Sequence, residues 1–165
     1  MKKNIECTLV LIKPDGVEKG VHEDVFARYD RASLQLIYCS GKITATGEQL
    51  YKHYEEIGQL LTRKGEEIFN ETVKYMMSGP ILKAIIVGED AVKKVRELNG
   101  ATKPWEAEKG TIRADFGEID PKGPIRNVVH SSASIEEAKE EIKVWFSKEE
   151  LKKHLPNQYQ EYYPD

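Results

Sequence analysis

The feature that most constrains the fold is a short, nearly unbroken apolar run near the start of the chain, Thr8–Lys13, with the sequence TLVLIK. An apolar run of this length without polar alternation predicts a strand buried on both faces. Pro14-Asp15-Gly16 follows it, and because proline fixes φ while glycine permits positive φ, these residues predict a turn. The chain therefore begins with a buried strand of a layered domain.

Strand-like and helix-like patterns alternate along the rest of the chain. Further strands are predicted at Leu34–Ile43, Ile81–Val87 and Asn127–His130. Helices are predicted at Glu23–Ala32, Gly47–Leu61, Glu66–Met77, Asp90–Asn99, Ser134 to about Phe146, and once more before the tail. This βαββαβ order predicts an α+β fold, a ferredoxin-like sandwich in which a four-stranded antiparallel sheet carries helices on one face.

Two additions to this fold are predicted. The helices at 47–61 and 66–77 form a helical hairpin, with a polar break at 62–65. The segment 101–126 has no durable period and is rich in proline and glycine. A loop of this length inside a compact domain is often functional, so it is a candidate active-site loop.

Composition limits the classes of protein to which the chain can belong. The 165 residues, 39% of them hydrophobic, predict a single domain over 1–165 with its own core. No long apolar run occurs and 32% of the residues are charged, so we expect a soluble, cytoplasmic protein without a secretion signal or membrane span. A net charge of −3 argues against nucleic-acid binding. Cys7 and Cys39 form no CxxC pair and are expected to be small buried residues.

One histidine stands apart from the others. His130 ends an apolar strand and is followed by three small residues, Ser131–Ala133. Such a junction leaves the imidazole uncrowded and points the free N–H groups of the next helix at an approaching group. Glu141, on the flank of the next helix, is a candidate to hold the imidazole. The other three histidines are interpreted as solvated surface groups: His22, His53 and His154. From the residues alone, a merely structural His130 is an equal alternative.

Basic residues at fixed places offer a phosphate-binding set. Lys13 ends the first strand just before the predicted turn, and Arg96 and Arg113 bracket the start and middle of the long loop. An arginine guanidinium presents a planar fork suited to phosphate oxygens. Taken singly, each also fits an ordinary surface charge. Neither GxxxxGK[ST] nor GxGxxG occurs, so phosphate binding would depend on side chains and a helix end.

The segment Asn127–Ser134, NVVHSSAS, with the following helix that ends in Trp145-Phe146, resembles the active-site signature of nucleoside diphosphate kinases, N-x-x-H-G-S-D-S. Segments 8–17, 74–80 and 110–116 resemble the same family in the same order. The resemblance implies a phosphotransferase that passes the γ-phosphate of a nucleoside triphosphate to a nucleoside diphosphate. It also implies a ping-pong mechanism through phospho-His130.

The resemblance further implies individual roles. Glu141 would hold the second ring nitrogen of His130, while Asn127 and Ser132 would shape the pocket. Phosphates or the transferring group would be contacted by Lys13, Tyr54, Arg96, Thr102 and Arg113, and the base would lie near Ile68 and Thr72. Mg²⁺ would arrive with the nucleotide, without a metal site of the chain's own. The partners would be ATP, other nucleoside tri- and diphosphates, and further copies of the chain in a hexamer or tetramer.

The chain departs from the family pattern in three respects. Ser131 and Ala133 stand in place of a glycine and an aspartate, Ile68 stands in place of an aromatic residue, and extra residues occur around 58–65 and 118–125. The intact basic set and His130 still predict an active enzyme. The alternatives are a catalytically weakened nucleotide-binding relative and a protein-histidine phosphocarrier. A nucleic-acid-binding role is the least favoured, because the chain is acidic.

Overall fold

The computed structural model describes residues 3–165. Four strands, β1 (Ile5–Ile12), β2 (Gln35–Cys39), β3 (Leu82–Glu89) and β4 (Val129–Ser131), form one sheet in the order β2-β3-β1-β4. All neighbouring pairs are antiparallel, with Leu9 opposite Ile85 and Leu11 opposite His130. The predicted four-stranded antiparallel sheet is confirmed, with β1 and β3 at its centre.

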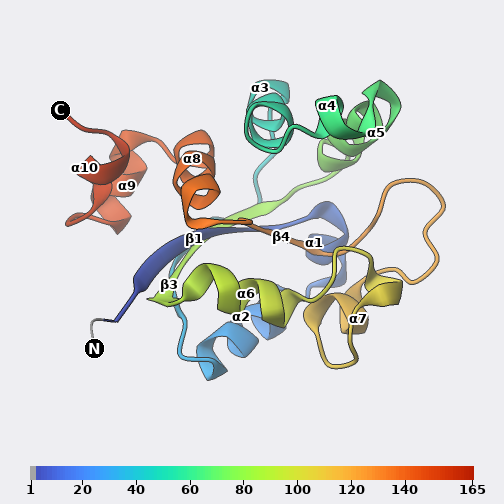
Figure 1. The fold of residues 1–165 in the computed structure, drawn as a ribbon, viewed down its shortest axis with the longest axis horizontal. Helices are drawn as coiled ribbons and strands as arrows, with labels where there is room; N and C mark the ends of the chain where they lie inside the picture. The colour runs from blue at the N-terminus through green and yellow to red at the C-terminus, as the bar shows by residue number, and fades with distance from the viewer. Residues whose placement is uncertain (1–2) are drawn as a thin grey trace.

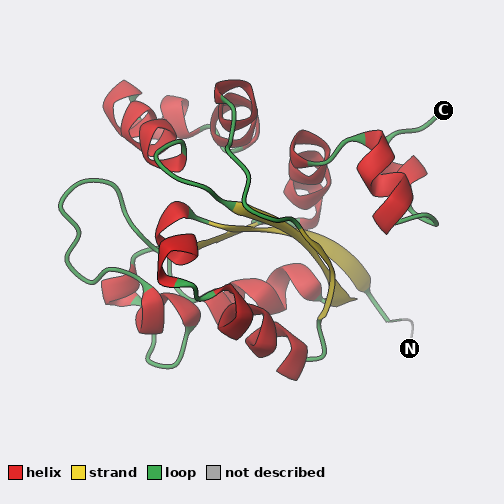
Figure 2. Ribbon diagram, turned by 180° about the vertical axis from the view of Figure 1, so that it is seen from behind, coloured by secondary structure: helices red, strands yellow, loops and turns green. Residues whose placement is uncertain are grey.

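Helices cover both faces of this sheet (Figures 1 and 2). One layer contains α2 (His22–Arg31), α6 (Ala91–Asn99) and α7 (Ile112–Phe116), the last preceded by the 3₁₀-helix η2 (Pro104–Glu106). The opposite layer contains α3 (Gly47–Tyr51), α8 (Ile135–Trp145), α9 (Lys148–His154) and α10 (Tyr159–Tyr162). The prediction of helices on one face was therefore wrong.

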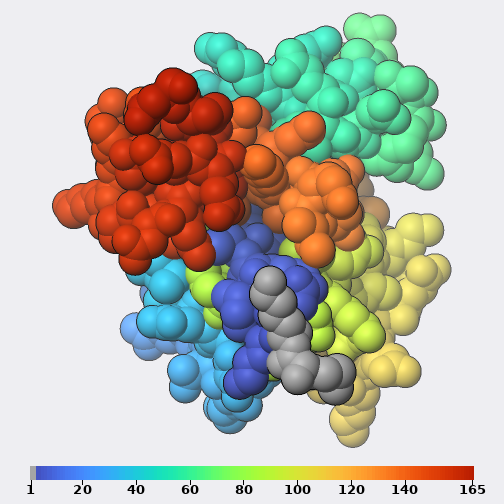
Figure 3. Space-filling model, turned by 60° about the vertical axis from the view of Figure 1, so that its left-hand side comes forward, coloured from blue at the N-terminus to red at the C-terminus, as the bar shows by residue number. Residues whose placement is uncertain are grey.

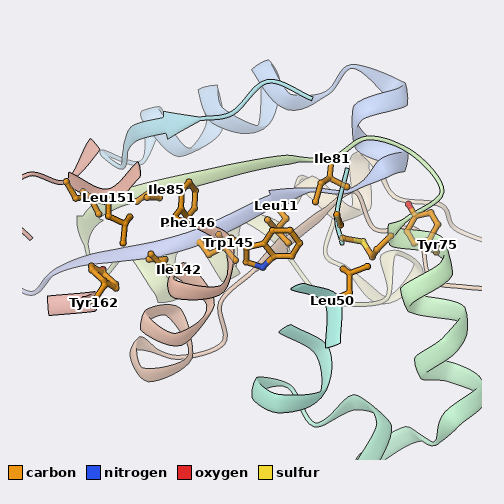
Figure 4. Close-up of a cluster of buried hydrophobic side chains, with 14 residues drawn as sticks. Leu11, Leu50, Tyr75, Ile81, Ile85, Ile142, Trp145, Phe146, Leu151 and Tyr162 are labelled. Carbon is orange, nitrogen blue, oxygen red and sulfur yellow. The ribbon is translucent and has the colours of Figure 1, made fainter. Parts of the chain in front are cut away.

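Side-chain alternation along β1 explains the second layer. Leu9 and Leu11 belong to a buried cluster with Trp145 of α8, which Figure 4 shows in part. Val10 and Ile12 belong to a second cluster on the other face. Because successive side chains of a strand point to opposite faces, a strand that is apolar at every position needs cover on both.

The residues that follow β1 form a helix rather than the predicted turn. Pro14 starts α1 (Pro14–Lys19) after Lys13 in extended conformation, a position that tolerates proline because the first N–H groups of a helix have no partner. Gly16 lies so close to the chain before β4 that a Cβ there would be 2.7 Å from the Val128 carbonyl oxygen. The start of α1 is thereby packed against the segment that carries His130.

The hairpin contains more turns than predicted. α3 continues as the π-helix η1 (Lys52–Ile57), and α4 (Leu60–Lys64) and α5 (Glu66–Met76) follow. The polar residues predicted as a break largely form α4, which begins after Gln59 at a φ of 52°. Figure 3 shows the teal hairpin and the red C-terminal helices as separate masses on the side of the molecule where α8 lies.

The positions of the two cysteines and the character of the helices were also predicted from the sequence. Cys7 and Cys39 are half-buried rather than buried, since they lie on β1 and the edge strand β2. Within residues 3–165, no helix has both the length and the apolar character needed to cross a membrane.

Candidate active site

The site is built around His130, the middle residue of β4. Its Nε2 lies 2.9 Å from Oε1 of Glu141 in α8, and the Ser132 hydroxyl donates a 2.7 Å hydrogen bond to the same oxygen. Burial alone would raise the pKa of Glu141, but its electrostatic interaction with the His130 ring and these hydrogen bonds lower it to about 2. The carboxylate is thus charged and fixes Nε2, which leaves Nδ1 of His130 to accept a transferred group.

His53, interpreted from the sequence as a surface group, is instead 2% exposed and packs on His130. The two rings meet edge to face with centroids 4.3 Å apart. The Trp145 indole N–H donates to His53 Nδ1 at 3.1 Å, and its nitrogen lies on the hairpin side of the ring in Figure 4. Burial, followed by the nearby His130, lowers the pKa of His53 to about 3. The His53 ring is therefore uncharged where it packs against His130.

Tyr54, the next residue of the π-helix, has a buried hydroxyl group without a hydrogen-bond partner among residues 3–165. Its ring meets that of His53 edge to face at 4.7 Å. Burial raises the pKa of Tyr54, so the hydroxyl keeps its proton. A buried hydroxyl without a partner is costly, so this O–H is a place where an oxygen of a bound group could accept a hydrogen bond.

A second hydrogen-bonded group joins β1 to the long loop. The Lys13 ammonium donates to Asn127 Oδ1 at 2.8 Å, and Asn127 Nδ2 donates to the Thr102 carbonyl at 2.8 Å. Burial, with the nearby Arg113 charge, lowers the pKa of Lys13 to about 8. This group brings a cation to the chain segment that leads into His130.

The backbone between Asn127 and His130 is strained. Val128 has a φ of 62°, a left-handed conformation that is unusual for a β-branched residue. Its N–H donates to Asp15 Oδ2 at 3.1 Å, and the Tyr75 hydroxyl donates to Asp15 Oδ1 at 2.5 Å. From the sequence, Asp15 was assigned only to a turn, although its place two residues after Lys13 was a usable signal.

Arg113 of α7 lies against β4. Its guanidinium donates to the carbonyls of Gly100 at 3.0 Å and Val129 at 2.8 Å, while Nε is buried without a partner in residues 3–165. Burial, reinforced by Arg96, lowers the pKa of Arg113 to about 10. Gly100 has a φ of 86°, and a Cβ there would lie 2.5 Å from the Thr111 hydroxyl oxygen. Glycine is thus needed where α6 meets α7.

The remaining predicted residues lie outside these hydrogen-bonded groups of the described chain. Arg96 of α6 is exposed and lines a cavity of about 480 Å³ together with Ala133 and Ser134. Ile68 on α5 is 45% exposed. Thr72, one turn later, bonds the Ile68 carbonyl at 2.8 Å. The structure therefore unites His130 with Glu141 and Ser132, and Lys13 with Asn127 and Thr102.

Comparisons with known proteins agree with one another. The sequence matches the family described as nucleoside diphosphate kinase (NDK) over residues 6–151. A nucleoside diphosphate kinase of Caldanaerobacter subterraneus subsp. tengcongensis is 43% identical over 142 residues, which cover 86% of this chain and 94% of that protein. One of Neurospora crassa is 40% identical over 149 residues, covering 90% of each.

A similar fold has been solved with a ligand. A nucleoside-diphosphate kinase from Borrelia burgdorferi, a transition-state mimic with bound vanadate and ADP, superposes with a TM-score of 0.80 and 30% sequence identity. The match covers 96% of this chain and 97% of that one.

Proposed function

Because the chain belongs to the nucleoside diphosphate kinase family, it is a phosphotransferase, and we propose that His130 carries the phosphate it transfers. The reaction is the passage of the γ-phosphate from a nucleoside triphosphate to a nucleoside diphosphate. The observation that carries the proposal is the bond between His130 Nε2 and the buried Glu141 carboxylate, at 2.9 Å. This bond occupies Nε2, so Nδ1 is the ring nitrogen that attacks the phosphorus.

Two displacements complete the reaction. In the first, the Nδ1 lone pair forms a bond to the γ-phosphorus, the bond from that phosphorus to the bridging oxygen breaks, and the diphosphate leaves. The proton stays on Nε2, where the Glu141 carboxylate stabilises the positive ring. In the second, a terminal oxygen of another diphosphate attacks the phosphorus and the P–N bond breaks, which restores His130. This is ping-pong transfer.

Charge on the phosphates is balanced by the cations and donors around His130. Lys13 and Arg113 are held close to β4, and Tyr54 offers a hydroxyl that no other described residue bonds. We assign phosphate contacts to these three residues, and further contacts to Arg96, Thr102 and Asn127. Phosphoryl transfer asks the protein mainly for positioning and charge stabilisation, which this set supplies.

The base and the metal complete the proposed complex. The exposed Ile68 and its helix neighbour Thr72 would contact the base. Among residues 3–165, the one group of three metal-ligating types is His53, His130 and Glu141. Mg²⁺ prefers an octahedron of oxygen ligands, so this nitrogen-rich set is a poor fit. The chemistry of the donors supports an Mg²⁺ that comes with the nucleotide phosphates and neutralises part of their charge.

We also propose a single-domain chain that assembles into a homo-oligomer, a hexamer or tetramer, in the cytoplasm. Exposed apolar side chains on the edge strand and the long loop support assembly, namely Leu36, Trp105 and Ile119, which are 39%, 43% and 57% exposed. Free cysteines fit a reducing compartment. Light scattering measures the assembly, with a monomer mass counting against it, and fractionation of the source cells tests the location.

Labelling with γ-labelled ATP and Mg²⁺ tests the function. The intact protein should take up acid-labile, alkali-stable label and release it as GTP when GDP is added. His130→Gln should take up none. The matched control is His154→Gln. His154 is a half-buried residue of α9 whose ring stacks on Tyr38, and this variant should behave as the unchanged protein. Label that GDP does not remove would favour a phosphocarrier, and a folded protein without label would favour a binding role.

A further inference from the structure

A buried hydrogen bond and a part-buried one form a chain that reaches Ser131, the residue next to His130, from the side of the sheet where α2 and α6 lie. The Tyr29 hydroxyl of α2 donates to Asn99 Oδ1 at 2.5 Å, and Asn99 Nδ2 donates to the Ser131 hydroxyl at 3.0 Å. Tyr29 is 1% exposed and Asn99 is 0% exposed. None of the three side chains has a part in the proposed transfer.

The two hydrogen bonds run in one direction, with each donor on the side of Tyr29 and each acceptor on the side of Ser131. Burial raises the pKa of Tyr29, so its hydroxyl stays protonated and donates to the amide oxygen of Asn99. The amide group must then turn its NH₂ towards Ser131. A buried amide bonded at both ends has one orientation, and the loss of either partner leaves a buried polar group unsatisfied.

β4 needs such support because it has only three residues and lies at the edge of the sheet, paired on one side with β1. A side chain from a different helix holds each of the three. Arg113 of α7 binds the Val129 carbonyl, Glu141 of α8 binds the His130 imidazole, and Asn99 of α6 binds the Ser131 hydroxyl.

We propose that Asn99, oriented by Tyr29, is a positioning residue that fixes Ser131 and with it the backbone of the adjacent His130. The inference rests on the proposed function, because it gives His130 the role of phosphate carrier. Transfer requires the nucleophile, the phosphorus and the leaving oxygen to be nearly in line, and small displacements of a nucleophile are costly in rate.

Single-turnover labelling by ATP tests this role. Ser131→Ala should slow phosphorylation of His130 about tenfold at saturating ATP, with the half-saturating ATP concentration changed less than about twofold. Ser131→Thr keeps the hydroxyl and should stay within about threefold of the unchanged protein. Tyr29→Phe should also slow the step. The double variant should be no slower than Ser131→Ala, because both substitutions break one chain.

Two further measurements separate positioning from mere stability. The control Thr8→Val removes a fully buried hydroxyl elsewhere in the sheet, one without a partner in residues 3–165, and should leave the rate unchanged. The imidazole ¹⁵N signals of His130, read without turnover, should broaden or shift in Ser131→Ala.

Four outcomes would overturn the inference. A Ser131→Ala protein that is less heat-stable but equally fast would make the chain purely structural. Strictly additive losses in the double variant would show that Tyr29 does not act through Asn99. An intact protein that takes up no label would remove the proposed function and this inference with it, whereas normal labelling with an unaffected Ser131→Ala would remove the inference alone.

Discussion

At the scale of single residues, His53 makes the stability of the fold depend on pH. Its pKa in the folded protein is about 3, whereas an unfolded histidine has a pKa of about 6.5. Between these values the unfolded chain binds a proton that the folded chain does not, so the free energy of unfolding falls as the pH falls. His53→Gln should remove this dependence, which amounts to roughly 2 kcal/mol between pH 6.5 and 4.5.

Urea unfolding at a series of pH values measures this effect. The window stops at pH 4.5 because Glu141, whose pKa is lowered to about 2, adds its own loss of stability between its unfolded pKa of about 4.5 and that value. Above about pH 8, well past the unfolded pKa of about 6.5, neither state carries the His53 proton, so the slopes of the two proteins should agree there. An equally steep loss in His53→Gln below pH 6.5 would contradict the assignment.

Residues whose role depends on chain order were predictable from the sequence, whereas residues whose role depends on rotation about a helix axis were not. The site around His130 was predicted because a strand end, small residues and a helix flank follow each other closely along the chain. His53 was misjudged because residues 47–61 were predicted as one α-helix, whereas residues 52–57 form a π-helix. The wider turn rotates His53 to the interior, and π-turns are common at functional sites.

At the scale of elements, Arg28 fastens α2 to α7, the helix that carries Arg113. Its guanidinium bonds Asp115 of α7 at 2.8 Å, the Gly110 carbonyl at 3.2 Å and Asp24 at 2.7 Å, and lies over the Phe116 ring. Arg28→Ala should therefore loosen α7, lower the free energy of unfolding by roughly 1–2 kcal/mol and raise the half-saturating ATP concentration.

Calorimetry and initial rates at varied ATP check both effects. Lys52→Ala is the matched control, because Lys52 makes an exposed pair with Glu48, one turn earlier, at 3.1 Å. Such pairs contribute about 0.3–0.5 kcal/mol, so the control should change neither quantity measurably. If Arg28→Ala lost stability without any change in the ATP dependence, α7 would not need this anchor to hold Arg113.

The position of an element was predictable where one sequence pattern dominated. The prediction failed where the same residues fit two kinds of structure. The apolar runs predicted the four strands of the described sheet, and α6 ends at Asn99, where the helix 90–99 was predicted to end. Pro14-Asp15-Gly16 has turn chemistry, but proline at a first helical position serves a helix equally well, and packing against Val128 selects the helix. The apolar run of β1 implied that helices cover both faces of the sheet. The order of strands and helices, taken alone, favoured helices on one face.

At the scale of the whole molecule, the shared central strand should make the two helical layers unfold as one unit. Leu9 and Val10 are neighbours on β1 and both are 0% exposed, but Leu9 packs in the cluster with Trp145 and Val10 in the opposite cluster. Leu9→Ala and Val10→Ala should each lower the free energy of unfolding, by about 2–5 kcal/mol for the leucine and less for the valine.

The informative measurement follows Trp145 fluorescence in a Trp105→Phe background, beside far-UV circular dichroism at one protein concentration. Trp145 reports on the layer of α8, yet Val10→Ala, on the other face, should shift its midpoint as far as it shifts the dichroism midpoint, because β1 cannot leave one cluster and remain in the other. If Trp145 kept its original midpoint while the dichroism transition moved, the layers would unfold separately. His130, which pairs with β1, would then depend on only one of them.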